Sequence, residues 1–139
     1  MNSAAARTWT AIVADTDTGS LANIRKWMHG LGYDTERVRS ADAIVSALSG
    51  RTRAVVIASL SLPGLDAARL CRDVRAAVRN AYVLFFLDGD AEQAMMEQAV
   101  DAGADDVVSK PLVEAELRAR LHLAGGFMPK AARIKREGE

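Results

Sequence analysis

The chain has little of what cross-linked folds and many metal sites require, since it contains one cysteine, Cys71, and two histidines. A single cysteine excludes an intrachain disulfide framework and a cysteine-rich metal cluster, which fits a reducing cytoplasm. The chain also has no excess of either charge, because lysine plus arginine and aspartate plus glutamate both number 18. No apolar run approaches the roughly 18 residues of a membrane-spanning helix. We therefore expect a cytoplasmic protein whose partners are neither nucleic acid nor a membrane.

The sequence is instead a regular alternation of strand-like and helix-like segments. The strand-like segments are "WTAIVAD", "YDTERVR", "AVVIAS", "YVLFFL" and "DVVS", and the second is polar enough for a sheet edge. A segment with helical periodicity follows each one. Ser20 or Thr18 is expected to cap the first helix, Ser40 the second, and Gly103 to end the fourth. The buried face of the last helix is expected to consist of Val113, Leu117, Leu121 and Ala124.

Five strand–helix units with short connections predict a doubly wound α/β fold with a parallel sheet and helices on both faces. We expect one domain over residues 10–124, a leader over residues 1–9 and a flexible tail or linker over residues 125–139. On the third helix, Cys71 belongs to the apolar stripe. The basic side chains of that helix are expected to form a solvated face: Arg69, Arg72, Arg75 and Arg79.

Binding sites on such sheets lie where the strands end. The residues that follow the strands are Asp15, Thr16 and Asp17, then Ser59, then Asp88, and finally Lys110 and Pro111. On these motifs the chain resembles the receiver domain of bacterial response regulators. The features that match are "IVAD", "SLSLPGLD", "AGADD" and the final "KP", and the resemblance runs from about Thr10 to about Ala124. It implies the flavodoxin-like (βα)5 fold with strand order 2-1-3-4-5.

The resemblance also implies a chemistry that this chain departs from. In the family, a third-strand aspartate accepts a phosphoryl group, an acidic pair after the first strand holds Mg²⁺, and a strand-four hydroxyl, a strand-five aromatic residue and a lysine complete the site. Here the phosphoacceptor position falls on Ser59 and the acidic pair on Asp15 and Thr16, with Asp17 an extra acid one residue later. The hydroxyl position falls on Asp88 and the aromatic position on Val107.

Of the family's site, Asp15, Lys110 and Pro111 remain. With two carboxylates replaced by hydroxyls, Mg²⁺ binding is expected to be weak or absent. A serine hydroxyl needs an adjacent base to act as a nucleophile, and neither histidine is placed to supply one. Lys110 is expected to pair with Asp15 or Asp88, or to bond to Ser59.

Two alternatives stay open. Asp15 and Asp17 have the Asp-x-Asp spacing of haloacid-dehalogenase-like phosphatases, although Gly19 stands where those enzymes have threonine or valine. A receiver that responds to another ligand at the same crevice is also compatible with the sequence. The favoured interpretation is a pseudo-receiver, not an enzyme, that acts as a phosphorylation-independent protein–protein interaction module in bacterial two-component signalling. Its expected partners are signalling proteins such as a histidine kinase or a downstream effector, and it is expected to be a monomer or weak homodimer.

Overall fold

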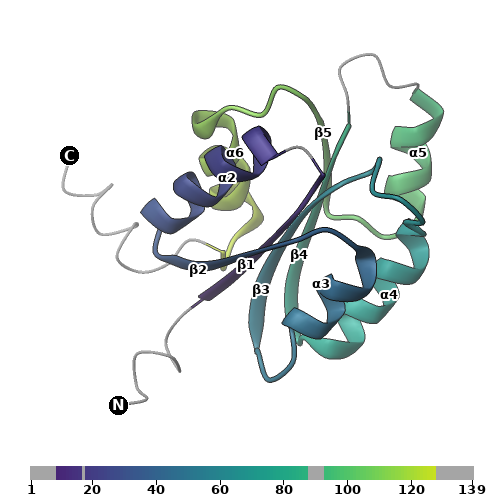
Figure 1. Cartoon of the computed structure of the whole chain (residues 1–139), viewed down its shortest axis with the longest axis horizontal. Helices are drawn as coiled ribbons and strands as arrows, with labels where there is room; N and C mark the ends of the chain where they lie inside the picture. Colours follow the sequence, from purple (N-terminus) through teal and green to yellow (C-terminus); the bar gives the residue numbers. More distant parts are fainter. Residues whose placement is uncertain (1–8, 17, 88–92, 128–139) are drawn as a thin grey trace.

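The structure, a computed structural model, describes residues 9–16, 18–87 and 93–127. The sheet contains β1 (Trp9–Ala14), β2 (Tyr33–Val38), β3 (Arg53–Ser59), β4 (Asn80–Leu87) and β5 (Asp106–Ser109). All neighbouring strands are parallel, and their order is β2-β1-β3-β4-β5. Both the predicted fold class and the edge position of the second strand are therefore confirmed (Figure 1).

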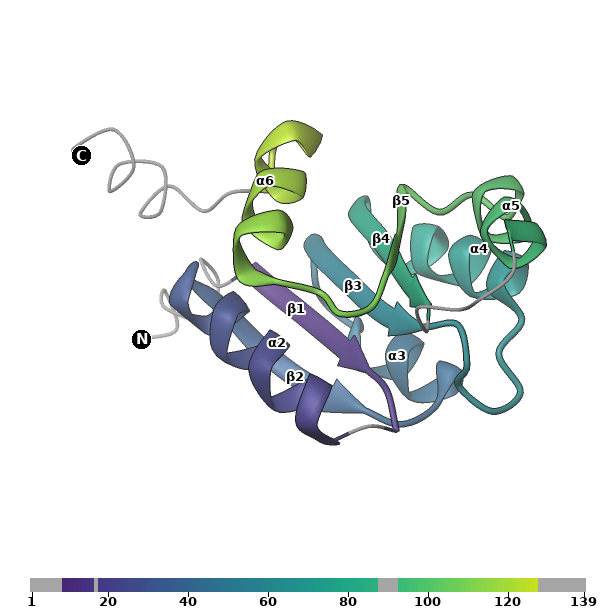
Figure 2. The ribbon, with the colours of Figure 1, turned by 90° about the horizontal axis from the view of Figure 1, so that it is seen from above.

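The helices are α2 (Thr18–Gly30), α3 (Ala41–Ala47), α4 (Ala67–Ala77), α5 (Gln93–Asp101) and α6 (Glu114–Ala124). Helices α2 and α6 cover one face of the sheet, and α3, α4 and α5 cover the other (Figures 1 and 2). In the described ranges, none of these helices has the length and apolar content needed to cross a bilayer.

Each face of the sheet contributes to its own apolar core, because successive side chains of a strand point to opposite sides. In β4, Leu84 and Phe86 pack towards α2 and α6, whereas Val83 and Phe85 pack towards α3, α4 and α5. All four side chains are fully buried. This burial on both sides explains why the central strands are continuous apolar runs and not alternating ones.

The ends of several helices follow from single residues. Ser40 caps α3, with its hydroxyl accepting a hydrogen bond from the backbone N–H of Ala43 at 3.2 Å. Asp66 caps α4 by accepting from the N–H of Arg69 at 3.0 Å. Gly103, two residues after the end of α5, has a φ of 105°, a conformation that favours glycine. The caps predicted at Ser40 and the stop at Gly103 are confirmed.

Two details of the helix predictions are wrong. Leu117 and Leu121 are buried as predicted, but Val113 is 50% exposed and Ala124 is also exposed. Val113 has extended backbone as the residue before α6, and Ala124 is the last residue of that helix, so α6 buries only its central turns. In addition, α2 begins at Thr18, so Ser20 lies inside the helix and cannot be its cap.

Arg75 is exposed, as predicted for this face, but its guanidinium also bonds to other elements of the fold. Its guanidinium donates to the carbonyl oxygens of Ala81 at 3.0 Å and Gly103 at 2.7 Å, and to the carboxylate of Asp105 at 3.0 Å. The same carboxylate oxygen accepts from the N–H of Val83 at 2.7 Å. Arg75 therefore ties α4 to β4 and to the turn after α5.

Ordered contacts continue past the expected end of the domain at Ala124. The ring of Phe127 packs against Tyr82, with the two centroids 5.5 Å apart. The backbone carbonyl of Phe127 accepts a hydrogen bond from the hydroxyl of Tyr33. Phe127, which lies in the expected tail, thus packs against the face that α2 and α6 cover.

Candidate functional site

The carboxyl ends of β1, β3 and β5 bring Asp15, Ser59 and Lys110 to one edge of the sheet. β1 pairs directly with β3, and β4 lies between β3 and β5. Asp15 follows β1, Ser59 is the last residue of β3, and Lys110 follows β5. Three residues separated widely in sequence therefore lie at the same carboxyl edge of the sheet, here called the crevice.

Asp15 and Lys110 form a partly buried ion pair. The Lys110 ammonium lies 3.1 Å from Asp15 Oδ2, and their side chains are 20% and 5% exposed, respectively. The other oxygen of Asp15 accepts a hydrogen bond from the N–H of Thr16 at 2.7 Å. Asp15 was one of the partners expected for Lys110. Both oxygens of this carboxylate are thus already engaged within the chain.

Ser59 is buried, with 1% of its surface exposed, and its hydroxyl is used locally. The Oγ atom accepts from the N–H of Ser61 at 3.1 Å and lies 2.8 Å from the Oγ of Ser61. The carbonyl of Ser59 accepts from the N–H of Leu62 at 3.2 Å, which starts the turn that precedes Pro63. Serine side chains commonly bond to the backbone two residues further on. The hydroxyl of Ser59 therefore helps to shape the turn between β3 and α4.

The remaining predicted site residues are less closely connected. Thr16 is exposed, and Val107 is half-buried and packs against the core on the α3, α4 and α5 side. Pro111 follows Lys110 through a cis peptide bond. Asp17 and Asp88 lie outside the described residues.

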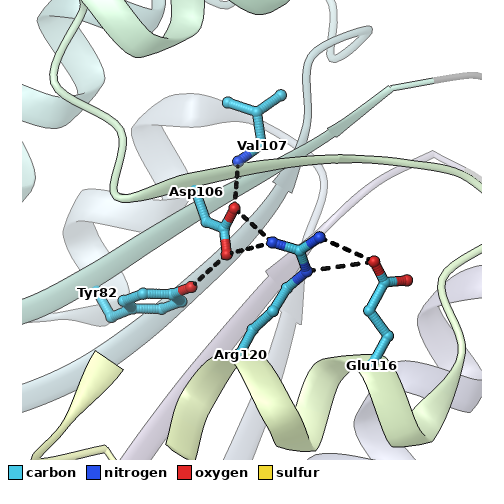
Figure 3. A network of polar contacts seen from close by, with 5 residues as sticks. All are labelled: Tyr82, Asp106, Val107, Glu116 and Arg120. Atoms are coloured by element: carbon cyan, nitrogen blue, oxygen red, sulfur yellow. Dashed lines mark hydrogen bonds and ion pairs between the residues drawn. The ribbon is translucent and has the colours of Figure 1, made fainter. Parts of the chain in front are cut away.

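A polar network at β4, β5 and α6 was not anticipated from the sequence (Figure 3). The carboxylate of Asp106 accepts from the hydroxyl of Tyr82 at 2.8 Å, from the N–H of Val107 at 2.9 Å and from the guanidinium of Arg120 at 2.7 and 2.8 Å. Arg120 also bonds to Glu116 at 2.9 Å. The four-residue spacing of Glu116 and Arg120 on a helix was a usable signal. The contact of Asp106 with Tyr82 depends on the strand register and had no such signal.

Both tyrosines of the chain have perturbed hydroxyl groups. Burial raises the pKa of Tyr82, and the hydrogen bond that it donates to Asp106 raises this pKa further. Burial also raises the pKa of Tyr33. In each case the cause is the cost of placing a phenolate in a poorly solvated site.

These shifts predict a loss of stability at alkaline pH. Because the folded-state pKa is higher than the ordinary value of 10.0, the unfolded chain releases phenol protons that the folded chain keeps. The contribution of the two phenol groups to the free energy of unfolding is complete below pH 10.0 and is lost as the pH rises above that value. We expect the urea midpoint to fall when the pH is taken about one unit above the ordinary tyrosine value. The Tyr82→Phe variant should lose less stability over the same interval, and an identical pH slope in both proteins would contradict this assignment.

The donor set at the crevice does not fit Mg²⁺ well. Mg²⁺ prefers several oxygen ligands in octahedral geometry, whereas the described crevice offers one carboxylate, Asp15, whose charge Lys110 already balances. Among the residues described, no group of three or more His, Cys, Asp or Glu side chains is arranged to hold a metal ion.

The comparisons with known proteins agree with the fold and with the family. The family model for the response regulator receiver domain matches residues 11–122. The response regulator MprA of Mycobacterium sp. (strain KMS) is 26% identical over 110 residues, which cover 79% of this chain and 47% of the relative. The chain therefore spans about half the length of the curated relatives that it matches.

Solved structures show the same fold. The receiver domain of a sensor histidine kinase from Pseudomonas aeruginosa, with magnesium coordinated in its active-site cleft, superposes with a TM-score of 0.69 at 24% identity. That match covers 86% of this chain and 99% of the other. A CheY-like receiver domain protein from Methanospirillum hungatei gives a TM-score of 0.72 at 17% identity, covering 84% of this chain and 93% of the other.

Receiver domains of this kind interact with histidine kinases and effectors in two-component systems. The family match extends from β1 into α6 and includes every strand end that forms the crevice. The protein therefore belongs to the response regulator receiver domain family.

Proposed function

We propose that this receiver domain works without aspartyl phosphorylation, as a protein–protein interaction module in bacterial two-component signalling. The observation that carries the proposal is Ser59. The end of β3 presents a buried hydroxyl already bonded to Ser61, where the family chemistry needs a carboxylate to attack phosphorus.

Among the residues that the structure describes, the surroundings of Ser59 offer no substitute for that carboxylate. A serine nucleophile needs a base within hydrogen-bond reach. Asp15 is paired with Lys110. His29 lies in the last turn of α2 and His122 near the end of α6, and both are exposed. Helix α2 runs back along the sheet from the end of β1, so its last turn lies far from the end of β3.

The same residues support weak or absent Mg²⁺ binding. Thr16 supplies a neutral hydroxyl at the second position of the acidic pair, and Asp15 is held by Lys110. Gly19, where the phosphatases have threonine or valine, argues against the phosphatase alternative. We therefore propose a non-enzymatic module.

Output in such a domain must be controlled by something other than a phosphoryl group. Val107 has no ring that could change rotamer, and the Asp15–Lys110 pair is formed within the chain itself. We propose a single conformation at this crevice, recognised by a histidine kinase or a downstream effector. Partner abundance or a different ligand would then set the signal.

Amide NMR spectra recorded with beryllofluoride and Mg²⁺ test this proposal. We expect the resonances of Asp15, Ser59 and Lys110 to stay unchanged, because the chain offers no acyl phosphate site to mimic. The magnesium-binding receiver domain from Pseudomonas aeruginosa is the positive control for the ion, and the Thr16→Asp/Ser59→Asp double variant restores both missing carboxylates here. Shifts in the unaltered protein that spread from the crevice into α5 would contradict the proposal.

A further inference from the structure

A cavity of about 380 Å³ opens beside the crevice, between α2, the end of β4 and the connection from β5 to α6. Its lining includes Ile24, Trp27 and Phe86, which belong to the core on the face that α2 and α6 cover. Its lining residues are Asn23, Ile24, Trp27, Phe86, Lys110, Pro111 and Leu112. Phe86, near the end of β4, and the segment Lys110–Leu112 thus line the side of the cavity opposite α2.

The size and lining of this cavity are those of a small-molecule site. Such sites occupy about 300–1,000 Å³ and combine an apolar lining with a few polar groups that fix orientation. Here the half-buried Trp27 contributes an aromatic ring, and Pro111 and Leu112 contribute further apolar surface. Phe86 is fully buried and offers no open ring face. The ring of Trp27 favours a planar aromatic guest, because ring pairs gain energy beyond the area that they bury.

The charges at the cavity select a neutral guest. Lys110 Nζ lies 5.0 Å from the ring centroid of Phe86 and 3.1 Å from Asp15 Oδ2. Asp15 balances the charge of Lys110, the charged residue in the lining, so the cavity offers no net charge to an anionic guest, and a cationic guest would meet Lys110. Asn23 offers an amide, which can both donate and accept a hydrogen bond.

We propose that this cavity binds a small, neutral, planar aromatic molecule. The ring lies against Trp27, and one polar group of the guest bonds to the Asn23 side chain. The existence of this binding site does not depend on the proposed function. The further idea, that the guest replaces phosphorylation as the signal, does rest on the proposed function. Lys110 connects the two, because it lines the cavity and also forms the ion pair with Asp15.

Indole is the probe for this site, since it is neutral and planar and carries one N–H donor. In a titration followed by NMR, we expect saturable shifts of the Ile24, Phe86 and Lys110 amides and of the Trp27 side-chain N–H. The side-chain N–H of Trp9 serves as an internal reference. Trp9 is the first residue of β1, at the end of the strand away from Asp15. A smaller shift at Asp15 should accompany binding and would report the link to the crevice.

Variants locate the guest. Asn23→Ala should weaken indole binding about fivefold, the value of one ordinary hydrogen bond. Lys26→Ala is the matched control on the same helix, because Lys26 is exposed and does not line the cavity, and it should leave the affinity unchanged. Leu112→Trp fills the cavity and should abolish binding, with circular dichroism confirming that the variant is folded.

Several results would overturn the proposal. One is the absence of saturable shifts up to the solubility limit of indole, and another is unchanged affinity in folded Leu112→Trp. Tighter binding of benzoate or tryptamine at the same amides would rule out the neutral class. Removing residues 128–139 should leave the amides of the guest-free cavity in place, and a shift there would mean that this segment of the chain is the occupant. None of these outcomes alters the beryllofluoride result, so the two proposals fail separately.

Discussion

Replacing Lys110 by methionine is expected to lower the free energy of unfolding by about 3 kcal/mol at neutral pH, since removing one partner of a buried ion pair leaves an uncompensated charge. The side chain of Asp15 is only 5% exposed, so water cannot readily take the place of the ammonium group. Methionine keeps most of the length of the lysine side chain, so the loss reports the charge and not a void. Urea denaturation at constant pH measures it.

A double-mutant cycle separates this pair from the rest of the crevice. Asp15→Asn alone should also destabilise the protein, because Lys110 then loses its carboxylate partner. The double variant should lose clearly less than the sum of the two single losses. Strict additivity would contradict the assignment of Lys110 to a structural pair with Asp15. The cycle matters for function, because the family resemblance gives this lysine a phosphoryl contact, whereas the geometry here gives it a carboxylate.

Truncating Phe85 to alanine is expected to cost about 3–5 kcal/mol, the usual loss when a fully buried aromatic side chain is removed from a core. Phe85 has no exposed surface and packs among the residues that join the sheet to α3, α4 and α5. Thermal or urea unfolding followed by circular dichroism measures the loss. Leu123→Ala is the matched control, because Leu123 is 83% exposed and its truncation should change stability by less than about 0.5 kcal/mol. Similar losses in the two variants would contradict the described core.

The fold could be predicted because it depends on patterns that are local in sequence. β4 is a continuous apolar run since both of its faces are covered, and Ser40 caps α3 through a bond three residues away. The proximity of Asp15, Ser59 and Lys110 was predictable for a different reason. Parallel strands deliver their carboxyl ends to one edge whatever their exact register.

Contacts that depend on register and side-chain reach were not predictable. Tyr82 and Asp106 are 24 residues apart and meet because β4 and β5 pair as they do. Arg75 looked like one of four surface arginines, yet its guanidinium reaches a carbonyl 28 residues away. The cavity beside Lys110 likewise depends on how far apart α2 and the β5–α6 connection lie, which no sequence pattern encodes. Periodicity identifies which face of a helix is buried, but not how much of that face the sheet covers, as Val113 shows.

The attachment of Gly103 to Arg75 has a mechanical consequence for α5. The turn that ends this helix is pinned to α4 and, through Asp105, to the backbone of β4. Together with the hydrogen bond from the N–H of Asp105 to the carbonyl of Val83, these contacts anchor the carboxyl-terminal end of α5 to two neighbouring elements.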